Sequence, residues 1–289
     1  MNWVLGTANF GSRYGITNFT ALTQSEVIEI LEECRKWGIN TVDTANAYLG
    51  SESILGEFSE KYPFNVSTKI SVNEGDSELT IKAKIKDTRE KLRTSKLDTV
   101  LLHSPAHIVA SNGNMLSKVL DECVDIGYIK SYGASVYSET DLEVCLYALP
   151  RGSTFQVPEN PIDQRMRDSK VVKDARQSGI KFQVRSIFLQ GLLVSDLEQI
   201  PYLDSTLLST INEFYNFCEK KLISPLDLCI AYAATIEWAS DIIFGVNGIV
   251  QLREILNAIS NVPNFKAEAL LGIPRATSPQ IDPRNWKRP

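Results

Sequence analysis

Short apolar, β-branched runs alternate along the chain with longer stretches in which apolar residues recur at helical spacing. Eight of these runs predict buried strands, at residues 4–5, 41–42, 66–67, 99–102, 131–134, 155–157, 181–184 and 242–244. Between them, segments such as 25–37 and 116–126 carry apolar residues three or four positions apart, as one face of a helix does. Eight strands that alternate with helices predict a parallel (β/α)8 barrel, the TIM-barrel architecture.

Glycine and proline mark the predicted ends of several helices. Gly38, Gly127 and Gly179 each follow a helical pattern and precede a predicted strand, which is where glycine ends a helix. In the long interval between the last two strands, Ser224 and Pro225 form an N-cap followed by proline at the first helical position. They predict that a helix begins there, at about residues 225–238, after another at about 207–221.

The length fits one barrel. The chain has 289 residues, and α/β barrels reach this size as a single domain, so we expect one domain over residues 1–289. Two segments are expected to be irregular. The long loop 190–203 is a candidate for folding over a cofactor. The proline-rich segment 272–289 either dangles or closes over the mouth of the barrel.

Composition narrows the functional classes. Hydrophobic residues make up 43% and charged residues 22%, and 30 basic against 35 acidic residues give a net charge of -5. No global positive field would attract nucleic acid or an anionic membrane. The five scattered cysteines fit reduced thiols, and the chain shows neither a signal peptide nor a long apolar run. We expect a cytoplasmic protein with a small-molecule substrate and, for lack of zinc-ligand spacing, no metal.

Four side chains that hold or transfer protons follow predicted strands: Asp43, Tyr48, Lys69 and His103. A parallel barrel collects its catalytic groups at these strand ends. A carboxylate, a phenol, an ammonium and an imidazole in one pocket suggest proton transfer to a carbonyl oxygen. Each residue alone has a structural explanation, as a core histidine or a structural ion pair, but their shared placement favours catalysis. Tyr48 is the expected proton donor.

The other three residues have expected roles around Tyr48. The ammonium of Lys69 would favour the phenolate of Tyr48 and so improve proton donation. Asp43 would pair with Lys69 and offset the burial of a lone cation. His103 would hydrogen-bond the substrate oxygen and orient it.

Several short motifs occur in a characteristic order: Gly6-Thr7, the run from Asp43 to Tyr48 with Ser51-Glu52 and Leu55-Gly56 behind it, Gly133-Ala134-Ser135, Gln156 before Asn160-Pro161, and Gly245. Together with the strand-end lysine and histidine, they resemble the aldo-keto reductase family over nearly the whole chain. The resemblance implies a TIM barrel, a nicotinamide cofactor and the same four catalytic roles. Many members begin with a β-hairpin that closes the barrel bottom. Here Gly6-Thr7 follows almost at once, so this hairpin should be missing.

The cofactor site is expected in an unusual place for a dinucleotide. No Gly-x-Gly-x-x-Gly turn is present, but residues 244–254 read as a strand, glycines and a helix, which suits phosphate binding by the last βα-loop of a barrel. By resemblance to the family, the cofactor-binding residues are Gly6, Thr7, Ser135, Gln156, Arg185, Ser186, Gly191, Gly245, Asn247, Gln251 and Glu254. Ser135 and Gln156 would bind the nicotinamide carboxamide.

Some of these positions depart from the common family pattern. Val136 stands where many members have asparagine, and Arg185 stands where many have a tyrosine that stacks on the nicotinamide. Gly245 and Gln251 stand where many members that use NADPH have a lysine and an arginine, so that Arg253 is the nearest cation. NADP(H) is favoured over NAD(H) from the family's general preference.

The expected substrate pocket is formed by Phe10, Arg13 and Tyr14 of the first loop, together with Trp286. Arg13 and Tyr14 would suit a polar or anionic carbonyl compound such as a sugar derivative, although Arg13 would equally pair with an acid at the rim. Two rival functions remain. One is an aldolase with Lys69 as Schiff base, which a charged lysine paired with Asp43 disfavours. The other is a cofactor-binding sensor or regulatory subunit with slow turnover.

Overall fold

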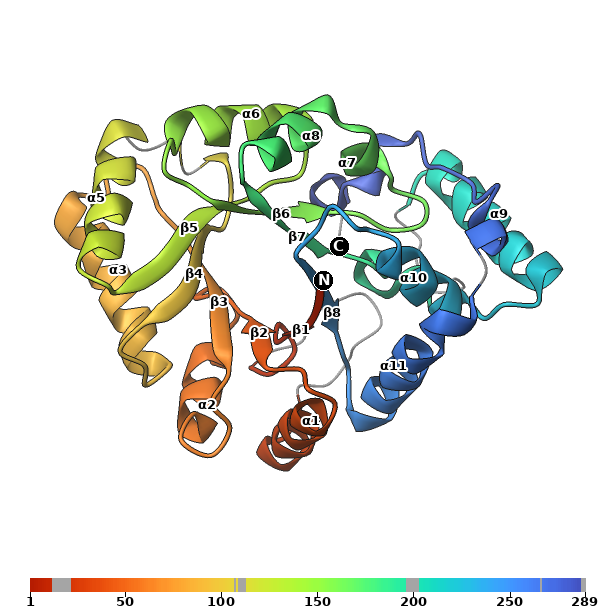
Figure 1. The fold of residues 1–289 in the computed structure, drawn as a ribbon, viewed down its shortest axis with the longest axis horizontal. Coiled ribbons are helices and arrows are strands. Elements are labelled where there is room, and N and C mark those ends of the chain that lie inside the picture. The colour runs from red at the N-terminus through yellow and green to blue at the C-terminus, as the bar shows by residue number, and fades with distance from the viewer. Residues whose placement is uncertain (12–21, 107, 109–112, 196–202, 266, 287–289) are drawn as a thin grey trace.

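The structure, a computed structural model, describes residues 1–11, 22–106, 108, 113–195, 203–265 and 267–286. Its strands form a closed parallel barrel in the order β1 to β8, surrounded by the helices (Figure 1). The strands are β1 (Asn2–Gly6), β2 (Thr41–Asp43), β3 (Asn65–Ile70), β4 (Leu97–Leu102), β5 (Ile129–Ser135), β6 (Thr154–Pro158), β7 (Lys181–Arg185) and β8 (Asp241–Gly245). All eight predicted strands are present, which confirms the TIM barrel.

The helices follow the strands as the apolar periodicity predicts. They are α1 (Gln24–Lys36), α2 (Ser51–Phe58), α3 (Glu78–Lys91), α5 (Gly113–Asp125), α6 (Glu139–Ala148), α7 (Arg165–Asp168), α8 (Lys170–Gln177), α9 (Ser205–Lys221), α10 (Pro225–Ala234) and α11 (Ile249–Asn261). Helix α10 ends four residues before the predicted position 238. Its last turn tightens, because the amide of Ile236 donates to the carbonyl of Ala233 at 3.1 Å instead of continuing the helical pattern.

The predicted helix ends are confirmed. Gly38, Gly127 and Gly179 have φ angles of 74°, 80° and 90°, in the left-handed region that glycine adopts without steric cost. At the start of α10, the Ser224 hydroxyl accepts a hydrogen bond from the Asp227 amide at 3.0 Å. Local sequence signals therefore set where these helices begin and end.

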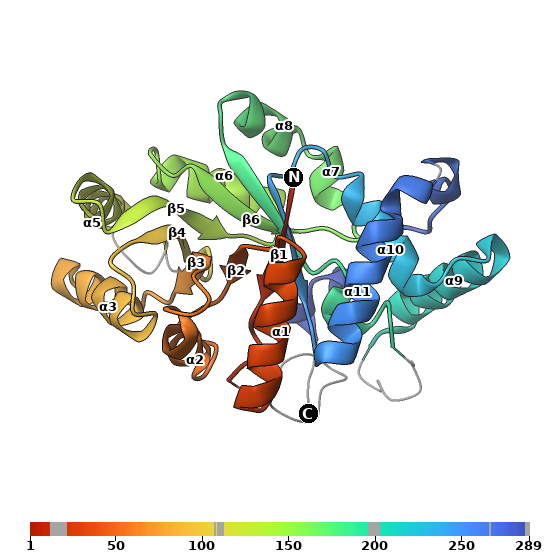
Figure 2. The ribbon, with the colours of Figure 1, turned by 60° about the horizontal axis from the view of Figure 1, so that its bottom comes forward.

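The barrel closes where its first strand pairs with its last. Strand β1 pairs with β8 in parallel, with Gly6 opposite Gly245. Helices α1 and α11 consequently lie side by side on the outside (Figure 2). This closure brings residues separated by most of the sequence to one end of the barrel.

The C-terminal segment is anchored as far as it is described, so the alternative that it dangles is wrong. The amide of Ala276 donates to the carbonyl of Ile162 at 2.8 Å, and the Ser278 hydroxyl donates to the Asp204 carboxylate at 2.5 Å. The indole of Trp286 is buried and donates to the carbonyl of Gln280 at 2.7 Å. In the loop 190–203, positions 196–202 lie outside the described residues.

Aromatic and aliphatic side chains fill the core of the barrel. Phe155, Phe182 and Phe244 are fully buried among the aliphatic side chains of the strands and helices. The five cysteines are buried and none forms a disulfide. In the part of the chain that the structure describes, no helix is both long and apolar enough to span a bilayer.

Candidate active site

The carboxyl ends of the strands bring the four predicted catalytic residues to one end of the barrel. Asp43 is the last residue of β2, Lys69 lies one residue before the end of β3, and His103 directly follows β4. Tyr48 lies in the connection from β2 to α2. Its backbone amide donates to the carbonyl of Ala45 at 3.0 Å, which closes a turn. Parallel strands face the same way, so these side chains share one environment.

Asp43 and Lys69 form a buried ion pair. The Lys69 ammonium lies 2.5 Å from Asp43 Oδ2, and the two side chains are only 2% and 5% exposed. Lys69 also donates to the carbonyl of Thr44 at 3.3 Å. The other carboxylate oxygen, Asp43 Oδ1, accepts a hydrogen bond from Gln156 Nε2 at 2.8 Å. Asp43 is therefore fixed on both oxygens, as a buried charge must be to offset its desolvation.

Tyr48 stands against this pair and against His103. Its ring centroid is 5.4 Å from the Lys69 ammonium, and its ring meets the His103 ring edge to face at 5.9 Å between centroids. Burial raises the pKa of Tyr48, and the Asp43 carboxylate raises it further, while Arg185 opposes both. The direction of this pKa shift is opposite to the lowering expected from Lys69, because the burial of the phenol is the largest effect.

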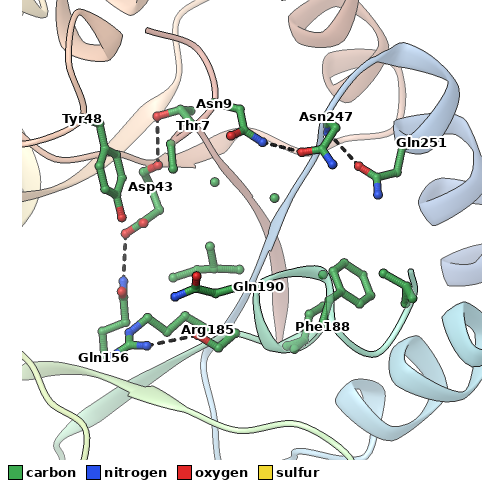
Figure 3. A pocket seen from close by; sticks show the side chains of 18 residues that line it. Thr7, Asn9, Asp43, Tyr48, Gln156, Arg185, Phe188, Gln190, Asn247 and Gln251 are labelled. Carbon is green, nitrogen blue, oxygen red and sulfur yellow. Dashed lines mark hydrogen bonds between the residues drawn. The ribbon is translucent and has the colours of Figure 1, made fainter. Parts of the chain in front are cut away.

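A cavity opens beside Asp43 and Tyr48 and runs along the ends of β1, β7 and β8 (Figure 3). Its space is about 860 Å³, open solvent at the mouth included. Nine of the eleven residues predicted to bind a cofactor line it: Gly6, Thr7, Gln156, Arg185, Ser186, Gly191, Gly245, Asn247 and Gln251. The other lining residues are Ala8, Asn9, Ile187, Phe188, Gln190, Val194 and Ile243, with Asp43 and Tyr48.

One end of the cavity lies at the amino end of α11. The N-cap of α11 is Gly248, and no atom of the described residues lies within 4 Å of where a Cβ of Gly245 would stand. The amide of Asn247 donates to Gln251 Oε1 at 2.7 Å, and Asn9 donates to Asn247 Oδ1 at 2.6 Å. Open space beside backbone amides at a helix start is the usual setting for an anionic group.

The other end carries amide and hydroxyl groups. Gln156 Nε2 is engaged with Asp43, but buried Gln156 Oε1 has no hydrogen-bond partner among the described residues. Ser135 is not among the lining residues, and its hydroxyl accepts a hydrogen bond from Arg185 Nε at 3.3 Å. The side chain of Asn160 holds its own loop, accepting from the amides of Ile162 and Asp163. An acceptor at Gln156 Oε1 suits the NH2 group of a carboxamide.

Several predicted residues lie away from the cavity lining. Lys69 and His103 are not among its lining residues, and Glu254 is exposed on α11. Phe10, 1% exposed, packs in the hydrophobic core, as does Trp286 at 6%. Arg13 and Tyr14 lie outside the described residues.

Arg253, predicted as the cation nearest to the cofactor phosphate, forms an ion pair with a residue of another helix. Its guanidinium lies 2.9 Å from Glu29 of α1 on the outer surface, and both side chains are about half exposed. Arg253 thus contacts helix α1 on the outer surface.

Sequence reasoning missed Asn9, Phe188 and Gln190 among the lining residues. Asn9 follows the end of β1 by three residues, so its position after a barrel strand was an available signal. Phe188 and Gln190 belong to a connection that holds Ser186, Leu189 and Gln190 at positive φ, which no local pattern announces. Among the described residues, no group of three or more histidine, cysteine, aspartate or glutamate side chains is arranged to hold a metal.

Known proteins resemble the chain along nearly its whole length. The model of the aldo/keto reductase family matches residues 3–270. The oxidoreductase SirO of Leptosphaeria maculans is 22% identical over an alignment of 295 positions, which covers 90% of this chain and 89% of SirO. Among solved structures, an aldo-keto reductase of Bacillus halodurans in its holo form gives a TM-score of 0.76 at 18% identity, over 93% of this chain and 89% of the other. A second solved structure, from Pseudomonas aeruginosa, gives a TM-score of 0.64 at 21% identity, over 90% of each chain.

The similarity to the two solved structures shows the fold, and the family model matches from the first barrel strand to residues that follow α11 in the sequence. The matched residues include Asp43, Tyr48 and Lys69 and the residues that line the cavity. The chain belongs to the aldo/keto reductase family.

Proposed function

We propose that the protein is an NADP(H)-dependent oxidoreductase that reduces an aldehyde or a ketone to an alcohol, with Tyr48 as the proton donor. The observation that carries the proposal is the placement of Tyr48. Its phenol stands at the wall of a cavity, directly against the buried pair of Asp43 and Lys69. Membership of the aldo/keto reductase family supports a nicotinamide cofactor in this cavity.

The residues along the cavity fit such a cofactor. Gln156 Oε1, buried and without a partner among the described residues, would accept from the carboxamide NH2. The amides at the start of α11 and the open space at Gly245 would receive the phosphates. When bound, the reduced nicotinamide supplies the hydride that adds to the carbonyl carbon.

Tyr48 completes the reduction. As the C–H bond forms and the carbonyl π bond breaks, negative charge collects on oxygen, and the phenol donates its proton there to form the new O–H bond. A raised pKa keeps Tyr48 protonated and ready to donate. An alkoxide is a stronger base than a phenolate, so transfer remains favourable. The nearby Lys69 ammonium then stabilises the phenolate until solvent returns the proton.

His103 and Asp43 hold this arrangement. The edge-to-face contact fixes the Tyr48 ring against His103, which would orient the substrate oxygen by a hydrogen bond. Asp43, held by Lys69 and Gln156, keeps the ammonium in place. The same contact disfavours Lys69 as a Schiff-base nucleophile, because the ammonium is buried, paired and outside the cavity lining.

The preference for NADP(H) rests on the family pattern. Among the described residues that line the cavity, Arg185 is the one lysine or arginine, and Arg253 is paired with Glu29. Recognition of a 2′-phosphate would therefore come from backbone amides at the start of α11, and selectivity over NAD(H) should be small.

The test is oxidation of NADPH and NADH, followed at the nicotinamide absorbance, with a panel of aldehydes, ketoses and 2-oxo acids. We expect turnover with at least one class of carbonyl compound. Tight cofactor binding with no turnover across the panel would instead identify a sensor or regulatory subunit. Absence of both binding and turnover would reject the proposal.

A further inference from the structure

Arg185 places a positive charge in the wall of the cavity. It is the last residue of β7, lines the cavity and is partly buried. Its side chain donates to neutral acceptors: Nε donates to Ser135 Oγ at 3.3 Å, and the two terminal nitrogens donate to Ser186 Oγ and to the carbonyl of Val136, both at 3.1 Å. These hydrogen bonds fix the guanidinium in place, and none of them offsets its charge.

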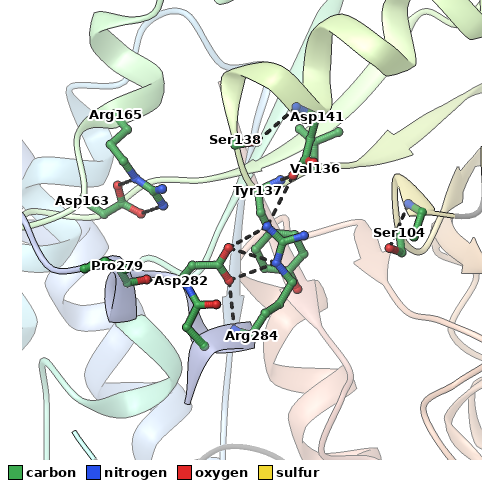
Figure 4. Close-up of polar contacts among 12 residues, drawn as sticks. Ser104, Val136, Tyr137, Ser138, Asp141, Asp163, Arg165, Pro279, Asp282 and Arg284 are labelled. Atoms are coloured by element: carbon green, nitrogen blue, oxygen red, sulfur yellow. Dashed lines mark hydrogen bonds and ion pairs between the residues drawn. The ribbon is translucent and has the colours of Figure 1, made fainter. Parts of the chain in front are cut away.

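Other arginines near the same end of the barrel are paired with acids. Arg165 forms a bidentate pair with Asp163 at 2.7 and 2.9 Å, and Arg284 lies 2.6 Å from Asp282 (Figure 4). Within the described residues, Arg185 forms no ion pair. Its charge is therefore able to act on a molecule that enters the cavity.

The cavity wall carries a net positive charge, as far as its residues are described. Asp43 is the one acidic residue among the described lining residues, and it is already paired with Lys69 at 2.5 Å. The two opposite charges of that pair largely cancel at a distance, whereas the charge of Arg185 does not cancel. A ligand group in this part of the cavity consequently meets a positive potential.

Arg185 lies beside the groups that the proposed function assigns to the nicotinamide. In the pairing of β6 with β7, it stands opposite Pro158, two residues after Gln156. Ser135, which accepts from Arg185, stands opposite Gln156 in the pairing of β5 with β6. Arg185, Gln156 and Tyr48 line the same cavity (Figure 3). Burial raises the pKa of Tyr48 and the charge of Arg185 opposes that rise, so the guanidinium also acts on the proton donor.

The two redox forms of a nicotinamide ring differ in charge. The oxidised ring carries one positive charge, and the reduced ring carries none. The sugars and phosphates are the same in both forms, so contacts to them act on both alike. A fixed positive charge a few ångströms away weakens binding of the positive form. At an effective dielectric constant of about 20, one such repulsion changes an equilibrium constant by at least about tenfold.

We propose that Arg185 makes the site select the reduced over the oxidised nicotinamide cofactor and thereby favours carbonyl reduction over alcohol oxidation. The inference rests on the proposed function and adds the preferred direction of its reaction. In the reduction, the carbonyl carbon receives a hydride from the cofactor and the oxygen receives a proton from Tyr48, and the oxidised ring that remains carries one positive charge. Repulsion from Arg185 then promotes release of the oxidised cofactor.

The experiment measures cofactor binding in the absence of a carbonyl substrate, so it does not depend on turnover. Isothermal titration calorimetry gives the dissociation constants of NADPH, NADP⁺, NADH and NAD⁺. The decisive quantity is the ratio of the constant of the oxidised form to that of the reduced form, within the phosphorylated pair and within the other pair. We expect a ratio above about 10 in both pairs for the unchanged protein.

Variants then assign the ratio to one side chain. Arg185→Gln removes the charge and keeps a polar side chain, and it should lower the ratio about tenfold, chiefly by tighter binding of the oxidised forms. Arg185→Lys keeps the charge and should retain most of the ratio. Arg284→Gln is the matched control, because Arg284 and Arg185 both lie 4.0 Å from the centroid of the Tyr137 ring and Arg284 is not a lining residue. Its ratio should equal that of the unchanged protein.

Three results would overturn the proposal. The first is a ratio near one in the unchanged protein. The second is a ratio that Arg185→Gln leaves in place, while circular dichroism shows that the variant is folded. The third is an equal loss of affinity for both redox forms in Arg185→Gln, which would assign the guanidinium to a contact that the two forms share.

Failure of the reductase function has a different signature. If the unchanged protein binds the cofactors with the expected ratio, Arg185→Gln lowers it, and no carbonyl compound of the panel is turned over, the selection by Arg185 stands and the reductase function is rejected. If carbonyl compounds are reduced and the ratio is near one, the reductase function stands and the role of Arg185 is rejected.

Discussion

Tyr48 keeps its proton at neutral pH, because burial raises the pKa of its phenol and the Asp43 carboxylate raises it further. Tyr48→Phe removes only the hydroxyl, so the ring contacts with Lys69 and His103 should persist. We expect intact folding and cofactor affinity, with carbonyl reduction lowered by at least about 100-fold. Steady-state rates with the best carbonyl of the panel, together with cofactor titration, measure this. A variant within a few fold of the unchanged protein would exclude Tyr48 as the acid.

The pair of Asp43 and Lys69 is stabilising only while both charges are present. Lys69→Met leaves the Asp43 carboxylate buried beside Gln156 without a cation, so we expect a loss of roughly 3 to 5 kcal/mol in the free energy of unfolding. The double variant Asp43→Asn with Lys69→Met should recover part of that loss and no activity. Urea unfolding of the two variants gives the comparison. Equal stabilities would show that the two charges do not act as a pair.

Three elements meet around a second buried carboxylate. Glu159, just after β6, is fully buried, accepts from the Tyr232 hydroxyl of α10 at 2.5 Å, and lies 3.7 Å from the Arg167 guanidinium of α7. Burial raises the pKa of Glu159 from 4.5 to about 8, against the opposing effects of these two partners. The packing of α7 and α10 against β6 therefore depends on whether this carboxyl is protonated.

The consequence is a stability that falls with rising pH. Between about 4.5 and 8 the folded state holds the Glu159 proton and the unfolded state has released it, so the contribution is complete below 4.5 and lost as pH rises to about 8. Glu159→Gln keeps the shape and an acceptor for Tyr232 but cannot ionise. We expect it to lose less stability than the unchanged protein between pH 5.5 and 8, a difference of the order of a few kcal/mol. Urea unfolding of both proteins at pH 5.5 and at pH 8 gives the comparison. An equal change in the free energy of unfolding in the two proteins would contradict the prediction.

At the scale of the whole molecule, barrel closure decides which cations lie near the proposed cofactor site. Helices α1 and α11 become neighbours, and Arg253 pairs with Glu29 across them, away from the cavity. Arg253→Ala should therefore leave the affinities for NADPH and NADH unchanged within about a factor of two, because exposed ion pairs contribute little and a contact to phosphate would contribute more. Fluorescence titration of both cofactors measures it. Loss of NADPH affinity alone would place Arg253 at the 2′-phosphate.

The same measurement addresses cofactor preference. With Gly245 and Gln251 at positions where many family members carry cations, the unchanged protein should bind NADPH less than about tenfold better than NADH, which corresponds to about 1.4 kcal/mol. A larger preference would require a cation that the described lining residues do not include.

The sequence alone predicted the barrel and the common location of Asp43, Tyr48, Lys69 and His103. Both follow from local information. Apolar residues at strand or helix spacing record which face of each element is buried, and parallel strands bring every residue at a carboxyl end to one side. The glycine and serine signals at helix ends are equally local, because they act on backbone angles within one turn.

Only the tertiary structure decided how these groups act on one another. The pKa of Tyr48 moves opposite to the direction expected from Lys69, since it depends on burial and on Asp43 and Arg185 together. Gln156 binds Asp43 across 113 positions of the chain, and Arg253 finds Glu29 across 224. Within the described residues, Arg185 forms no ion pair, while Arg165 and Arg284 each pair with an aspartate. Burial and Coulomb interactions sum over every segment that meets at a point in space, and no pattern along the chain contains that sum.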